Sequence, residues 1–416
     1  MKYLAAYIIL FLTVSLQAAD IHVGANKEYT DIRKAVEFSK NGDHIFIEPG
    51  TYNIFGLIID KSIMITGIGF PVIDACNLGT GITISAPNVT IEGILVRNIP
   101  VSYMVDNAGI RVERTKNVTI RNNRLENSFF AIYLSNSDEC TVTGNTIIGH
   151  SESESNSGNG IHLWKCNIID IENNKVSGHR DGIYFEFVSN SRIINNLSEN
   201  NLRYGLHFMF SEGNSYIRNI FRENGAGVAV MYTKRVEMIE NTFENNWGPS
   251  AYGLLLKDIS RSIIINNKFT KNTIGIYSEG STEILIKNNS FSENGWAMKM
   301  LGNCTDDTIV NNDFYSNTFD VSTNSSVSRN YFDANYWDKY NGYDLNRDGV
   351  GDVSYRPVSL FSTLVEKTPE AILLVRSFLV DLIDLTEKII PVFIPETLID
   401  NHPGMKHFNS NNGKRI

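Results

Sequence analysis

The chain has 416 residues and a formal net charge of −9, so it lacks the basic surplus that nucleic-acid-binding surfaces require, and we expect no nucleic-acid partner. Its length would ordinarily indicate about two or three compact domains. An internal repeat removes that expectation, because a solenoid grows along one axis.

Residues 1–19 have the pattern of a secretory signal peptide. Lys2 gives a positive start, residues 4–16 are almost wholly apolar, and Ala18 and Ala19 are small residues suited to cleavage. The apolar stretch is short for a bilayer span, which needs about 20 residues. An uncleaved membrane anchor is the alternative to a cleaved signal peptide, and both interpretations predict export.

The cysteines of the chain show no C-x-x-C spacing, which argues against a zinc or thioredoxin-type site. A disulfide would be compatible with an oxidising compartment, but the spacing does not predict a pair. We interpret them as small buried hydrophobic residues. They are Cys76, Cys140, Cys166 and Cys304.

A small residue followed by alternating apolar positions recurs about every 22 residues from Gly81 to Ala297. An Asn-x-apolar pattern recurs with the same period. Two independent sequence patterns with one period make a chance agreement improbable. The asparagines are Asn123, Asn145, Asn174, Asn196, Asn219, Asn241, Asn267, Asn289, Asn312 and Asn330.

The period predicts an all-β fold, a right-handed parallel β-helix of the pectin-lyase-like kind, over residues 20–335. Each coil should contain short strands, such as residues 183–187 and 192–194, separated by Asn, Gly and Ser turns. Inward side chains should stack from coil to coil, and the asparagines should hydrogen-bond along the axis. The expected inward column is Ile161, Ile183, Leu206, Val228, Leu254 and Ile276.

The open ends of a solenoid need caps. Residues 29–40 form an amphipathic pattern with Ile32, Ala35, Val36 and Ser39 on one side, which predicts an N-terminal cap helix. The C-terminal part should comprise a loop module at 336–368 and a helical extension with a tail at 369–416.

The loop module resembles the start of an EF-hand calcium loop, because Asp344, Asn346, Asp348 and Asp352 have the spacing of its ligands. Tyr355 occupies the position of the bidentate glutamate, which weakens the case for calcium. A loop of hydrogen-bonded Asx turns is the alternative.

Residues 369–390 are expected to form one helix, ended by Pro391, with an apolar surface interrupted by one narrow polar stripe. Such a surface must be covered. The helix either closes the C-terminal end of the solenoid or docks on a membrane partner. The polar stripe consists of Ser377, Asp381, Asp384 and Lys388.

Two groups of soft or borderline ligands suit Cu(I). His402, Met405 and His407 lie in the tail, where Gly404 would let them converge, or the tail is simply solvated. His207, Met209 and Met231 are expected on the outward face of adjacent coils, as an exposed patch for transient copper binding or partner docking. A loop such as the insertion at 151–159 would otherwise cover this patch.

A polysaccharide lyase or epimerase is the alternative class, with His179, Arg180, Asp181 and Glu186 as acid–base groups. The thioethers of the outward patch contribute nothing to sugar chemistry. The chain also has no Gly-x4-Gly-Lys-Ser/Thr motif, so we expect no ATP hydrolysis.

The chain resembles the NosD family, β-helical periplasmic proteins that take part in the maturation of nitrous oxide reductase. The resemblance covers essentially the whole mature chain and rests on GLHFMFS (205–211), GVAVMYT (227–233), GLLLKDI (253–259) and NYWDKYNGYDLNRDGVGDVSYRP (335–357).

The resemblance implies a non-enzymatic periplasmic protein that helps to assemble the copper centres of nitrous oxide reductase. It implies an ABC-type permease with its ATPase, a copper-chaperone lipoprotein and apo nitrous oxide reductase as partners, with membrane association through the permease. Transient Cu(I), or sulfur, would be the cargo.

Overall fold

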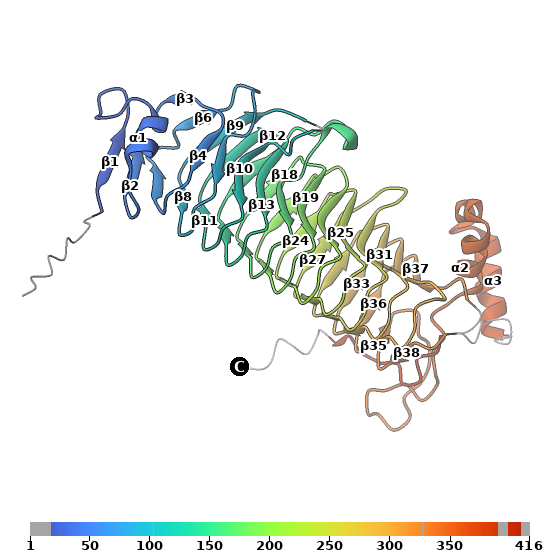
Figure 1. The fold of residues 1–416 in the computed structure, drawn as a ribbon. Coiled ribbons are helices and arrows are strands. Elements are labelled where there is room, and N and C mark those ends of the chain that lie inside the picture. Colours follow the sequence, from blue (N-terminus) through green and yellow to red (C-terminus); the bar gives the residue numbers. More distant parts are fainter. Residues whose placement is uncertain (1–17, 103, 326–327, 390–397, 409–416) are drawn as a thin grey trace, which may run out of the picture.

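The computed structural model describes residues 18–102, 104–325, 328–389 and 398–408. The chain winds into an elongated right-handed parallel β-helix whose coils contribute strands to three long sheets (Figure 1). These sheets have 14, 12 and 13 strands. Most of the expected signal peptide, residues 1–17, and the expected helix end at Pro391 lie outside the described residues.

Every coil repeats the same order of strands. The 14-stranded sheet runs from β1 (Asp20–Val23) to β38 (Tyr331–Asp333), and the 12-stranded sheet from β4 (Leu57–Ile59) to β37 (Phe319–Ser322). The 13-stranded sheet runs from β3 (Thr51–Asn53) to β39 (Tyr336–Trp337). One central coil consists of β19 (Asp181–Glu186), β20 (Arg192–Ile194) and β21 (Leu197–Glu199), which fits the predicted strands.

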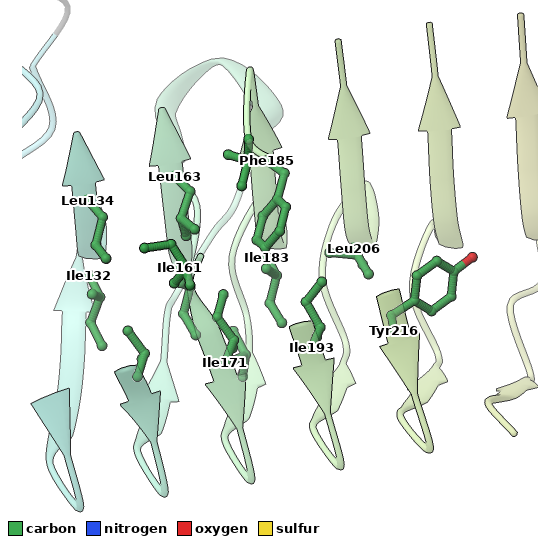
Figure 2. Packing of buried hydrophobic residues seen from close by; sticks show 14 of the residues in the cluster. Ile132, Leu134, Ile161, Leu163, Ile171, Ile183, Phe185, Ile193, Leu206 and Tyr216 are labelled. Carbon is green, nitrogen blue, oxygen red and sulfur yellow. The ribbon is translucent and has the colours of Figure 1, made fainter. Parts of the chain in front are cut away.

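The interior is filled by side chains that stack in register, since parallel strands about 4.8 Å apart align equivalent positions. Ile161 pairs with Ile183, and Ile183 with Leu206, and all three are fully buried. Figure 2 shows these side chains among the packed interior residues. The predicted inward column is therefore confirmed.

Asparagine side chains form the predicted axial column. Nδ2 of Asn196 donates to Oδ1 of Asn219 at 3.0 Å, and Asn219 repeats this contact to Asn241. The last rung was predicted wrongly: Nδ2 of Asn312 donates to Asn335, not to Asn330. Asn330 belongs to a different column, where its Oδ1 accepts from the backbone nitrogen of Asp307.

A second asparagine column was not predicted from the sequence. It satisfies the backbone at the turn after the 13-stranded sheet, where the backbone nitrogen of each asparagine up to Asn294 donates to the Oδ1 of the next one, and Nδ2 does the same except at Asn224. Its members are Asn201, Asn224, Asn246, Asn272, Asn294 and Asn317.

Helix α1 (Ile32–Phe38) lies at the N-terminal end of the solenoid and buries Ile32, Ala35 and Val36, as expected of a cap (Figure 1). It is shorter than the predicted helix over 29–40. The side chain of Asp31 accepts from the backbone nitrogen of Arg33 and starts the helix there, and Ser39 has an extended backbone that ends it.

The C-terminal extension differs from the single helix predicted over 369–390. It contains α2 (Leu360–Lys367), a 3-10 helix at Pro369–Leu374 and α3 (Phe378–Ile389). The chain breaks between the last two because Val375 leaves helical geometry and Arg376 has φ 67°. Helix α2 was not predicted at all.

The helical extension packs beside the solenoid, near its C-terminal end, against the outer side of the 12-stranded sheet (Figure 1). Phe361 and Val365 of α2 join a cluster with Trp296 and Phe319 of that sheet. Nζ of Lys299 also contacts a carboxylate oxygen of Glu366 at 2.8 Å. Residues 398–408 pair with the last coil through the bridges Phe332–Asp400 and Tyr336–Gly404 and cover the end of the solenoid, whereas the helical extension packs on its side.

Candidate functional site

The outward column of soft side chains lies on the 12-stranded sheet. Met209, at the end of β22 (Tyr204–Met209), is the direct partner of Met231, at the end of β25 (Ala226–Met231). Both side chains are half-buried, and the hydroxyl of Tyr184 donates to the sulfur of Met209 at 3.6 Å. Two neutral thioethers on adjacent strands are the part of the expected patch that stays accessible.

His207 is not exposed, contrary to the prediction. Its side chain is buried between the rings of Tyr184 and Tyr204, at centroid distances of 4.9 and 4.8 Å. Burial lowers the pKa of His207, although Asp181 opposes the shift. A neutral imidazole enclosed by two aromatic rings cannot reach a metal ion at the surface without displacing one of them.

Asp181 lies beneath the same ring cluster, at the start of β19. Its carboxylate is fully buried and accepts from Nε and Nη2 of Arg203 at 2.9 and 2.6 Å. Burial alone would raise the pKa of Asp181, but the nearby imidazole of His207 and the hydrogen bonds from Arg203 outweigh it and hold the pKa below its usual value. The carboxylate is therefore occupied inside the protein and does not face a substrate.

His179 is buried as well, and burial lowers its pKa to about 4. Of the acid–base groups considered for a polysaccharide enzyme, Glu186 lies in the outward column as the partner of Met209. The four residues are thus divided between buried and accessible positions and do not form one acid–base pair at the surface.

The insertion at 151–159, before β16 (Ile161–Trp164), approaches one end of this surface but leaves Met209 and Met231 half-buried, so the alternative that it covers the patch is not confirmed. Nδ2 of Asn159 lies 3.0 Å from Nδ1 of His162, and the charge of Glu154 acts on Arg203. The insertion thus lies over the end of the column that carries His162.

The tail ligands His402 and His407 are in contact with the last coils. Nδ1 of His402 lies 2.7 Å from a carboxylate oxygen of Asp333, and the ring of His407 packs against Tyr336 at a centroid distance of 4.0 Å with an interplanar angle of 35°. The backbone nitrogen of Met405 donates to Gly349 at 3.0 Å. The expectation of a free, hinged tail is wrong for residues 398–408, because their backbone is paired to the solenoid.

Gly404 forms bridges with Tyr336 and Val350, so it is a fixed part of this paired segment and not a hinge. Among the described residues, no group of three or more His, Cys, Asp or Glu side chains is arranged to hold a metal ion. That absence concerns imidazole, thiol and carboxylate ligands and does not extend to the thioethers of Met209 and Met231.

The acidic loop satisfies its own backbone. The carboxylate of Asp344 accepts from the backbone nitrogens of Asp348 and Gly349, and Asp352 accepts from that of Leu345. Tyr355, at the position of the EF-hand glutamate, is directed to Asp320 with an oxygen–oxygen distance of 3.5 Å. These contacts fit the loop of Asx turns.

The four cysteines are free thiols. Cys140, Cys166 and Cys304 are buried as predicted, whereas Cys76 is exposed, so the prediction is wrong for that residue. Burial raises the pKa of Cys140 to about 11 and that of Cys166 to about 12. Both therefore stay protonated at neutral pH, which suits small buried hydrophobic residues better than metal ligands.

One feature of this surface was missed from the sequence. Phe187, Phe210 and Tyr232 each follow the repeat glycine by five positions, so they stack in adjacent coils. All three side chains are exposed. The repeat register alone would have revealed this column, since the same spacing predicted the methionine pair.

The architecture and the partnered polar groups define a right-handed parallel β-helix protein with an accessible thioether pair. A thermostable α-1,3-glucanase from Streptomyces thermodiastaticus has the same fold, with a TM-score of 0.57 and 13% identity over 74% of this chain and 65% of its own. At that identity the likeness concerns the fold alone.

The chain belongs to the NosD family, described as periplasmic copper-binding proteins, whose model matches residues 74–154 and 148–342. Two relatives carry the name "probable ABC transporter binding protein NosD". The one from Stutzerimonas stutzeri is 28% identical and covers 80% of each chain. The one from Pseudomonas aeruginosa is 27% identical over 84% of this chain and 85% of its own. Within the described part of the chain, no helix is long and apolar enough to cross a membrane.

Proposed function

We propose that this chain is a periplasmic accessory protein for the maturation of the copper centres of nitrous oxide reductase. Family membership over most of the chain carries this proposal. A cleaved signal peptide at residues 1–19 would deliver the protein to the periplasm. Its cargo would be Cu(I), or sulfur, which it would hold briefly and pass on to apo nitrous oxide reductase.

Met209 and Met231 are the first candidates for the copper site. Both are half-buried and neutral, and their strands are paired, which brings two thioethers together without a charged competitor between them. Thioethers favour Cu(I), and a site with few ligands can release its ion. His207, enclosed by tyrosines, would join the site only after a local rearrangement.

His402, Met405 and His407 form a second candidate copper site. Their contacts with Asp333 and Tyr336 would have to open before the three side chains could converge. Calcium at Asp344, Asn346, Asp348 and Asp352 stays a separate, weaker proposal, because Tyr355 supplies no carboxylate.

The helical extension is our candidate for docking on the membrane permease of an ABC transporter, with the ATPase bound to that permease. Its packed side contacts the 12-stranded sheet, while a second side presents large exposed apolar side chains. A group of large exposed apolar side chains in one short segment indicates an interaction site. The exposed residues are Ile372, Leu373, Leu374, Phe378, Leu379, Leu382 and Leu385.

The second candidate function, an acidic-polysaccharide lyase or epimerase, gains little from the geometry, because Asp181 is fully buried against Arg203. A deletion strain distinguishes the two functions. Without this protein, nitrous oxide reductase should be present but deficient in its catalytic copper centre, measured by metal content and visible spectroscopy. Restoration by the wild-type gene supports the proposal, and fully loaded enzyme in the deletion strain contradicts it.

A further inference from the structure

A cavity of about 820 Å³ lies between the last strand of the 12-stranded sheet, the loop module and the helical extension. Strand β37 and helices α2 and α3 each contribute to its wall. Neither the methionine pair nor the cap segment 398–408 lines it, so it is separate from both candidate copper sites. Its aromatic lining consists of Phe319, Tyr340, Tyr343, Tyr355 and Phe361.

The side chain of Asp320, in β37, points toward this cavity. Asp320 occupies the repeat position that Ala297 holds in the preceding coil and Gly275 in the coil before that. A Cβ atom at Gly275 would lie 2.4 Å from the carbonyl oxygen of Ala297, so side chains at this position point to the next coil. Because β37 is the last strand of its sheet, the carboxylate of Asp320 takes the place of that next coil and lines the cavity.

The carboxylate of Asp320 is buried and lacks a close hydrogen-bond donor. Its Oδ2 lies 3.4 Å from Nζ of Lys339 and 3.5 Å from the hydroxyl of Tyr355, and its Oδ1 has no partner among the described residues. A buried carboxylate held so loosely is costly, so a ligand that donates to it would be favoured. Every other buried aspartate in the described part of the chain accepts a hydrogen bond of 3.0 Å or less; these are Asp43, Asp74, Asp181, Asp307, Asp313 and Asp400.

The neighbouring ammonium group of Lys339 serves the backbone first. Its Nζ donates to the carbonyl oxygens of Asn317 and Thr318 at 3.0 and 3.2 Å. In the preceding coil, the equivalent carbonyl oxygens accept from backbone nitrogens of the next strand. Lys339 therefore replaces donors that a further strand would supply, and its contact with Asp320 is the longest of the three. Burial raises the pKa of Asp320 to about 6 even though Lys339 opposes the shift.

The remaining lining favours a cation over an anion. Asp338 and Glu387 accept from the backbone nitrogens of Ser316 and Leu360, which leaves Asp320 as the carboxylate that lacks a close donor. Aromatic walls attract organic cations through their ring faces. The charged lining residues are the carboxylates Asp320, Asp338 and Glu387 and the cations Lys339 and Arg356.

A metal ion fits this cavity less well than an organic cation does. Ca²⁺ takes six to eight oxygen ligands, whereas an ammonium group lies beside the buried carboxylate here. In the part of the chain that the structure describes, no three His, Cys, Asp or Glu side chains are grouped to hold a metal ion.

We propose that this cavity binds an organic cation, a guanidinium or ammonium group, with the carboxylate of Asp320 as its anionic partner. A guanidinium suits the site best, because its planar face packs on aromatic rings and its N–H groups reach both oxygens of one carboxylate. A free small molecule and a basic side chain of a docked partner carry the same group. The site goes beyond the proposed copper function and does not depend on it.

The test uses the full mature chain and two probes of nearly equal shape, N-acetylarginine amide and N-acetylcitrulline amide, whose urea group is neutral. In calorimetric titration we expect the arginine probe to bind about tenfold or more tightly than the citrulline probe, since hydrogen bonds between charged groups are the stronger ones. Asp320→Asn keeps the side-chain size and should abolish this preference. Glu370→Gln is the matched control, because Glu370 is an exposed carboxylate of the helical extension that does not line the cavity. It should bind both probes as the wild type does.

Equal affinity of the wild type for the two probes, no binding of the arginine probe, or an unchanged preference in Asp320→Asn would each overturn the proposal. The first two results need only the wild type, so the test holds even if the variant does not fold. Once the preference is established, co-purification with the detergent-solubilised permease in excess arginine probe distinguishes the two sources of the cation. Lost permease binding assigns the cation to a partner side chain, and unchanged binding assigns it to a free small molecule. The titration contains neither copper nor nitrous oxide reductase, so its failure is distinct from failure of the deletion experiment.

Discussion

The carboxylate of Asp400 ends the asparagine column of the solenoid by accepting from both the backbone nitrogen and the side-chain amide of Asn335, each at 3.0 Å. The same oxygen accepts from the indole nitrogen of Trp337 at 3.0 Å. Asp400 is fully buried. Residues 398–408 therefore form a structural cap, and any copper role of His402, Met405 and His407 has to coexist with that cap.

Asp400→Ala should lower the free energy of unfolding by about 3 kcal/mol or more, because three buried donors lose their acceptor. Asp400→Asn keeps one acceptor oxygen and should cost less. Asn401→Ala, at the neighbouring exposed position, is the control and should change little. Chemical denaturation of the mature chain measures all three, and equal stability of the alanine variants would show that Asp400 is not part of the cap.

The asparagine column from Asn123 to Asn312 could be predicted from the sequence, because one period determines both the register and the inward direction of each asparagine. The last rung did not follow, because Asn330 has the right residue type but occupies another position of the coil. The true terminal acceptor, Asp400, is 65 residues from Asn335 along the chain. No local pattern relates residues so far apart.

The outward patch was likewise predicted from the sequence only in part. Period and alternation correctly placed Met209 beside Met231, yet they could not predict that His207 would be buried. Tyr204 starts the same strand, and Asp181 reaches His207 from the preceding coil at 3.6 Å. Burial here depends on side-chain packing between coils, which is tertiary information.

Asp307 should make stability depend on pH. Burial raises its pKa to about 6 from the ordinary value of 3.8, although Ser281 and Ile284 donate to it. Between about pH 4 and 6 the folded state binds more protons than the unfolded state, so stability falls as pH rises through this window. The loss by pH 7 is about 3 kcal/mol at most.

Asp307→Asn should reduce this slope and stabilise the protein at pH 7 by about 1–3 kcal/mol, since Asn214 and Asn330 already occupy the same position in other coils. Burial also raises the pKa of Asp320 to about 6 and raises that of Asp400, which adds to the slope. Burial lowers the pKa of His162, His179 and His207, which opposes it, so the test is the difference in slope between variant and wild type. Denaturation midpoints measured from pH 4 to pH 8 test this. An unchanged slope in the variant would mean that Asp307 titrates normally.

The exposed side of the helical extension should bind its partner without contributing to the stability of the solenoid. Leu379 and Leu382 are 48% and 47% exposed and lie three residues apart on α3. The double variant Leu379→Asp and Leu382→Asp should reduce co-purification with the detergent-solubilised permease more than about tenfold, while thermal unfolding changes little, because exposed positions contribute little to stability.

Ile383→Asp is the matched control on the same helix, because Ile383 packs against the cluster around Trp296 and Phe361. It should lower the free energy of unfolding by about 2 kcal/mol or more through loss of that packing. The opposite result would be that the double variant unfolds at a lower temperature than the wild type and binds the permease in proportion to its folded fraction. In that case the exposed side of α3 is not the docking surface.

Copper binding should distinguish the thioether pair from the tail. Met209→Leu with Met231→Leu preserves side-chain volume and removes both sulfur atoms, so we expect a loss of Cu(I) affinity of about tenfold or more, measured against a competing chelator. His402→Gln with His407→Gln keeps the cap segment in place, which truncation after Asp400 would not, because Gly404 and Met405 pair with the last coil. We expect this variant to bind Cu(I) almost as the wild type does. The opposite pattern would assign the ion to the tail, and unchanged affinity in both variants would exclude both sites.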